Sequence, residues 1–107
     1  MVEVNDILTV VSDAVKLCKE KEFVILEELL HKSYIELINV EAQARRQKAS
    51  SIIKALQLLD KEMFMLNNEY NKIIKKFNME PILAIDIYIE EIKKHRRKLV
   101  REKNSLR

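Results

Sequence analysis

The chain has 107 residues, no glycine, one proline, one cysteine and a formal net charge of +3. This length suits one domain and suffices to bury a core without metal or disulfide support. A single cysteine excludes an internal disulfide, and the lack of glycine excludes glycine-rich phosphate loops. Because sheets and tight turns usually need glycine, the composition predicts an all-α protein with residues 1–107 as one helical-bundle domain.

Targeting and membrane-spanning features are absent from the sequence pattern. The first residues, MVEVND, contain no basic stretch, so we expect no secretory signal. No uninterrupted apolar run exceeds four residues (82–85 is one), far below the ~20 residues of a membrane span. A lone cysteine fits a reducing compartment. We therefore expect a cytoplasmic protein without a membrane partner.

The first half of the chain contains two apolar stripes at helical spacing. A first helix is predicted up to the charged run 19–22, which interrupts the pattern and marks a boundary. Its stripe consists of Ile7, Val11, Ala14 (or Val15) and Cys18. The second stripe consists of Phe23, Leu26, Leu30, Leu37 (or Ile38) and Val40.

The path between residues 41 and 51 has two interpretations. In the first, one helix of about 55 residues runs from Glu22 to Phe77, and the alanines of this stretch favour it. In the second, a turn near residues 47–51 makes a hairpin, with Ser50 or Ser51 capping the next helix. Because globular helices seldom exceed about 25 residues, the hairpin is the preferred prediction.

The most regular pattern runs from Ile52 to Phe77. Its apolar residues are separated alternately by four and three positions, a heptad repeat that keeps one stripe of a helix against its partners. They are Ile52, Leu56, Leu59, Met63, Leu66, Tyr70, Ile73 and Phe77. We call this set the heptad row. It predicts an elongated antiparallel bundle of three or four helices with coiled-coil-like packing.

Pro81 marks the clearest boundary, because proline ends the helix before it and is favourable in the first turn of the next. The last helix is predicted from Pro81 to about Lys103. Its expected inner face consists of Ile82, Ile85, Ile89, Ile92 and Leu99. The alternation of apolar residues over 83–89 also fits a strand, but no second strand is evident to pair with it.

Patterns that could support catalysis or metal binding are incomplete. Glu28 and His31 have the spacing of a helical di-iron ligand pair, but Ile92 stands three residues before His95, so the second pair is missing. Cys18 lies on an apolar stripe, where a free cysteine behaves as a small hydrophobic residue. We therefore predict no catalytic, cofactor-binding or metal site and no enzymatic activity.

One segment of the predicted third helix is apolar on all sides and therefore needs cover on all sides. A bundle of short helices supplies little such cover, so the excess predicts a binding surface for a protein partner or a second copy. The alternative is that the flanking helices cover the segment completely. The predicted partner-binding residues are Met63, Phe64, Met65 and Leu66.

Charge is distributed unevenly along the chain. Residues 1–92 carry a net charge of −4, whereas residues 93–107 carry +7 and form a basic C-terminal helix end. Clustered cations attract phosphate, although a few cations also complement a helix C-terminus. Without interleaved aromatics, contact with nucleic acid would be to its backbone. Candidate contacts to phosphate or an acidic partner are Lys93, Lys94, Arg96, Arg97, Lys98 and Arg101.

Together these features predict a non-enzymatic helical interaction protein that self-associates, such as a small adaptor, a chaperone or an accessory subunit of a larger complex. The alternative is a nucleic-acid-associated protein that contacts the phosphate backbone through its basic C-terminal helix. Mass in solution and salt-dependent binding to nucleic acid distinguish these two hypotheses.

Overall fold

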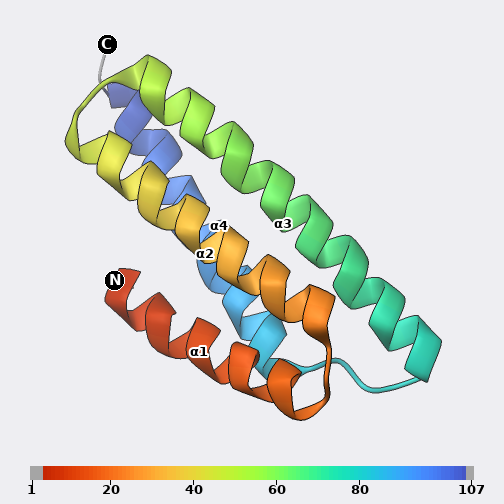
Figure 1. Cartoon of the computed structure of the whole chain (residues 1–107). Helices are drawn as coiled ribbons and strands as arrows, with labels where there is room; N and C mark the ends of the chain where they lie inside the picture. Colours follow the sequence, from red (N-terminus) through yellow and green to blue (C-terminus); the bar gives the residue numbers. More distant parts are fainter. Residues whose placement is uncertain (1–3, 106–107) are drawn as a thin grey trace.

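Four helices and no strand account for almost all of residues 4–105, the part of the chain that the computed structural model describes. They are α1 (Val4–Glu20), α2 (Val24–Arg45), α3 (Ala49–Phe77) and α4 (Leu83–Ser105) (Figure 1). The all-α prediction is confirmed for these residues. The described part measures 47 × 22 × 18 Å along its principal axes. None of its helices is long and apolar enough to cross a membrane.

The first two connections follow breaks in the apolar pattern. α1 ends inside the charged run 19–22, as predicted. A turn at residues 46–48 separates α2 from α3, so the single long helix is wrong and the predicted turn is confirmed. The predicted caps are wrong, because Ser50 and Ser51 lie within the first turn of α3 and Lys48 occupies the N-cap position.

A chain without glycine must use other residues where the backbone turns left-handed. Glu22 (φ 59°), Gln47 (φ 56°) and Asn78 (φ 48°) do so, one in each connection. Asn78 ends α3 with the two bonds of a Schellman motif, Met79 N–H to the Ile74 carbonyl (3.2 Å) and Asn78 N–H to the Lys75 carbonyl (3.3 Å). The left-handed conformation is less unfavourable for asparagine than for most other residues.

Tyr70 joins the last connection to α4. The backbone N–H of Ile82 donates to Tyr70 Oη (2.7 Å), and the Tyr70 hydroxyl lies 2.9 Å from Asp86 Oδ1. Burial and this bond raise the pKa of Tyr70 to about 12. α4 begins at Leu83, two residues after the predicted start at Pro81. The phenol therefore satisfies a backbone donor at the start of α4 that has no partner within the helix.

The heptad row faces the interior along most of α3. Six of its members are buried, Met63 is half-buried, and the last, Phe77, is 55% exposed. All five residues predicted for the inner face of the last helix are buried, Ile82 just before α4 and the other four within it, whereas Leu83 and Ile87 are exposed. That pattern follows helical periodicity, so the strand alternative is wrong. The α1 and α2 stripes are also buried, apart from half-buried Phe23 and exposed Ile38.

Contacts between helices follow from these inward rows. α2 packs most extensively against α3, and α1 packs on both α2 and α4 (Figure 1). Two polar pairs lie within the packed region: Ser33 bonds Tyr88 (2.6 Å), and His95 contacts Glu41. Each pair joins α2 to α4 by a polar contact that an aliphatic side chain could not make, which favours one alignment of the two helices.

Candidate interaction surfaces

The four residues predicted to bind a partner divide between core and surface. Leu66 is fully buried and Met63 is half-buried, whereas Phe64 is 67% and Met65 42% exposed. Successive residues of a helix point about 100° apart, so Phe64 and Met65 leave α3 in different directions. The alternative prediction, that the flanking helices cover this segment completely, is therefore wrong. The uncovered apolar surface is centred on Phe64.

Phe64 borders a groove between α3 and α4, which we call the α3–α4 groove. It has a volume of about 250 Å³. Both sets of residues predicted from the sequence meet here, because α3 supplies apolar side chains and α4 supplies apolar and cationic ones. The lining consists of Asp60, Met63, Phe64 and Asn67 from α3, and Ile89, Ile92, Lys93 and Arg96 from α4.

Both cations of the α3–α4 groove already lie near an anion of the same chain. Arg96 donates two hydrogen bonds to Asp60, Nε to Oδ1 (2.6 Å) and Nη2 to Oδ2 (2.8 Å). These bonds raise the pKa of the Arg96 guanidinium. Lys93 Nζ lies 3.5 Å from a carboxylate oxygen of Glu90. A phosphate group would therefore have to compete with Asp60 for the Arg96 guanidinium.

The other predicted cations follow α4 away from this groove. Lys94, Arg97 and Arg101 are exposed, and their spacing of three and four places them on one face of α4. Lys94 is near Glu91 (3.5 Å), while Arg97 and Arg101 make no ion pair within residues 4–105. Lys98 has the same spacing from Lys94 and Arg101, but it is half-buried. The remaining basic stripe is therefore short.

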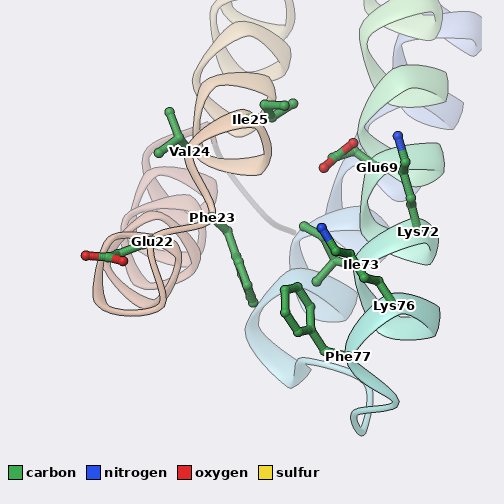
Figure 2. Close-up of a pocket in the computed structure, with 9 residues that line it drawn as sticks. All are labelled: Glu22, Phe23, Val24, Ile25, Glu69, Lys72, Ile73, Lys76 and Phe77. Atoms are coloured by element: carbon green, nitrogen blue, oxygen red, sulfur yellow. The ribbon is translucent and has the colours of Figure 1, made fainter.

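A second groove, which the sequence reasoning missed, lies between the beginning of α2 and the end of α3 (Figure 2). We call it the end groove; its volume is about 360 Å³. The rings of Phe23 and Phe77 meet in it, with centroids 5.8 Å apart, and Lys76 Nζ lies 5.5 Å from the Phe77 centroid. The remaining lining residues are Glu22, Val24, Ile25, Glu69, Lys72 and Ile73.

Large apolar side chains are exposed around the end groove. Val24 is 71% and Ile25 60% exposed, and Phe77 is also more than half exposed. Three such residues around one concavity are more than the scattered single exposures of an ordinary surface. The available sequence signals were the run Phe23–Leu26 directly after a boundary and the position of Phe77 at the end of the heptad row.

The residues weighed for metal binding and catalysis lie apart. Glu28 pairs with Lys32 (3.1 Å), and His31 Nε2 lies 3.9 Å from Glu27. Among residues 4–105, no three His, Cys, Asp or Glu side chains gather closely enough to hold a metal ion. Cys18 is buried, and burial raises the pKa of its thiol to about 11, which disfavours the nucleophilic thiolate at neutral pH.

Comparison with known proteins identifies no relative. No protein-family model matches the chain, and no curated protein or solved structure is significantly similar to it. The grooves and their charges are therefore the basis for assigning a function.

Proposed function

We propose that this protein is a non-enzymatic interaction protein, a small adaptor, chaperone or accessory subunit, that binds a protein partner through the α3–α4 groove and also self-associates. The observation that supports this most is Phe64, which is 67% exposed in the middle of a helix and borders an apolar floor. Covering such a side chain releases about 25 cal/mol per Å² of apolar surface, and aromatic anchors dominate many interfaces.

The size of the α3–α4 groove favours a partner side chain over a small-molecule ligand. Pockets for drug-sized ligands usually measure roughly 300–1,000 Å³. The α3–α4 groove, at about 250 Å³, falls below that range. One or two apolar side chains of a partner helix would fill it, with Lys93 beside them to contact an acidic residue.

We also propose how the whole chain is arranged around this groove. Residues 1–107 form one domain in the cytoplasm, an elongated antiparallel bundle with coiled-coil-like packing. Two rows at alternating spacings of three and four support this packing. One is the heptad row of α3, and the other consists of the buried residues Ile85, Tyr88, Ile92, His95 and Leu99 of α4.

A matched pair of variants tests the partner-binding proposal. Phe64→Ser removes the anchor, and Leu58→Ser removes an exposed apolar residue of α3 that does not line the groove. Proteins that co-purify with the wild-type chain from its native cells are quantified, and affinity for the major one is measured. We expect Phe64→Ser to weaken that affinity at least tenfold and Leu58→Ser to leave it unchanged. Equal effects of the two variants would contradict the proposal.

The exposed stripe of Lys94, Arg97 and Arg101 favours a second candidate function, backbone binding to nucleic acid. Duplex DNA is titrated at several salt concentrations, with Arg97→Gln/Arg101→Gln compared against Lys54→Gln/Lys61→Gln on α3. If both arginines contact phosphate, their removal lowers the slope of log K against log salt by about 1.8. No binding at low salt, or equal slopes for the two variants, excludes this function.

A further inference from the structure

We propose that the end groove is where a second copy of this chain docks, the two copies being related by a twofold axis. This inference rests on the self-association in the proposed function and assigns it a surface. The surface lies between α2 and α3 and is separate from the α3–α4 groove, whose lining residues it does not share.

The shape of the end groove is the first argument. A twofold interface is self-complementary, so one patch must contain both a protruding group and a hollow that receives it. Figure 2 shows Val24 projecting from the side of α2 that faces away from α3, while Phe23, Ile25 and Phe77 border the hollow between the two helices. A twofold rotation brings the Val24 of each copy toward the hollow of the other. Water then leaves the exposed apolar surface of both copies.

The charges around the end groove are the second argument. Two are anionic, Glu22 and Glu69, and two are cationic, Lys72 and Lys76. None of the four makes an ion pair within residues 4–105. Glu22 precedes α2 on one side of the hollow, while both lysines lie on α3 across it (Figure 2).

These four charged residues, which we call the rim of the end groove, carry equal numbers of both charges and therefore fit some occupants better than others. A rim of one sign would repel its own copy, whereas equal numbers of both signs allow each carboxylate to face a lysine of the partner copy. The same balance makes the end groove a poor site for nucleic acid or for a strongly charged peptide, which need a rim of one sign. A second copy of this chain is therefore the occupant that the charges fit.

Charge exchange gives a specific test. An acidic variant, Lys72→Glu/Lys76→Glu, and a basic variant, Glu22→Lys/Glu69→Lys, each have a rim of one sign. Sedimentation equilibrium over a concentration series measures the dimer dissociation constant of each variant, of their equimolar mixture and of the wild type. The matched control is Lys54→Glu/Lys61→Glu, which reverses two exposed lysines elsewhere on α3.

We expect the wild type and the control to dimerise alike, and each rim variant alone to dimerise at least tenfold more weakly. Mixing the two rim variants should restore dimers to within about threefold of the wild-type dissociation constant, because opposite rims then face each other. A monomeric wild type, rim variants that dimerise normally, or folded rim variants whose mixture does not associate would each overturn the inference. Circular dichroism establishes that all variants are folded.

A second pair of variants separates this inference from the partner-binding proposal. Phe77→Ser should abolish dimerisation, and Phe64→Ser should leave it unchanged. If Phe64→Ser abolishes the dimer and Phe77→Ser does not, the second copy occupies the α3–α4 groove, and the assignment to the end groove is wrong. A different outcome would contradict the partner-binding proposal: the Phe64→Ser variant would co-purify with the same set of proteins as the wild type.

Discussion

The two ends of α3 continue one heptad row but meet different surroundings. Near its beginning, Ile52 and Leu59 are fully buried. At its end, Phe77 continues the same spacing, yet more than half of it is exposed beside Phe23 in the end groove. Spacing of three and four decides which side of a helix faces its neighbours. How completely those neighbours cover that side depends on where they begin and end.

The largest expected effect is the difference in stability loss between mutating a buried residue of α3 and mutating an exposed one two positions away. Leu66→Ala removes a fully buried side chain and should lower the free energy of unfolding by about 2–5 kcal/mol. Phe64→Ala, at an exposed position, should change it by less than about 0.5 kcal/mol. Urea unfolding followed by circular dichroism measures both. Similar losses for the two variants would mean that Phe64 is covered in the native state.

The buried pair of Ser33 and Tyr88 should show an asymmetric response. The Ser33 hydroxyl has one proton and lies 2.9 Å from the Leu30 carbonyl, so the Tyr88 hydroxyl donates to Ser33 Oγ. Ser33→Ala leaves a buried phenol without a partner and should cost about 1–3 kcal/mol. Tyr88→Phe leaves Ser33 bonded to Leu30 and should cost about 0.5–1.5 kcal/mol. The reverse order in urea unfolding would contradict this assignment of the proton.

Alkaline pH should lower the free energy of unfolding, in part through the deprotonation of Cys18. Burial, and secondarily the charge of Glu27, raises the pKa of its thiol from 9.0 to about 11. The unfolded chain therefore loses this proton first, and the free energy of unfolding should fall as pH rises from 9 to 11. Cys18→Ala should reduce this slope while leaving the further loss from the tyrosines whose pKa is raised by burial, which are Tyr70 (to about 12), Tyr88 and Tyr34. Urea midpoints at pH 8, 9, 10 and 11 test the prediction; identical slopes in both proteins would contradict it.

The smallest expected effect lies at the wall of the α3–α4 groove. Arg96 and Asp60 form a two-bond ion pair, but both side chains are partly exposed. A double-mutant cycle with Arg96→Gln and Asp60→Asn should give a coupling energy of about 0.2–1 kcal/mol. The coupling should decrease between 0.05 and 1 M salt, because salt screens exposed charges. A larger, salt-independent coupling energy would mean that the pair is less exposed to solvent than the structure shows.

Sequence reasoning succeeded where the spacing was regular and failed where helices meet. The heptad row and the inner isoleucines of α4 were predicted because periodicity alone determines which side faces inward. Tyr88 and His95 were missed, although they continue the spacing of Ile85 and Ile92, because the inner face of the last helix was predicted from its aliphatic residues alone. Their partners, Ser33 and Glu41, lie more than fifty residues away along the chain.

The two grooves likewise could not be predicted from local sequence patterns. Phe64 and Lys93 were each predicted to contact partners, but no local pattern indicates that they line one groove. The end groove depends on α2 beginning opposite the end of α3, which follows from the lengths of these two helices and of the one turn that joins them. Arg96 was predicted to contact phosphate or an acidic partner; its anion within the chain, Asp60, is 36 residues away. Such pairings are properties of the packed chain.

Side-chain NMR of the full chain over a concentration series is the most direct test of where two copies meet. The proposed interface predicts that the methyl signals of Val24 and Ile25 and the ring signals of Phe77 shift as concentration rises. Signals of Phe64 and Ile89, in the α3–α4 groove, should stay constant. Signals that do not change at any concentration, or shifts confined to Phe64 and Ile89, would contradict docking of a second copy in the end groove.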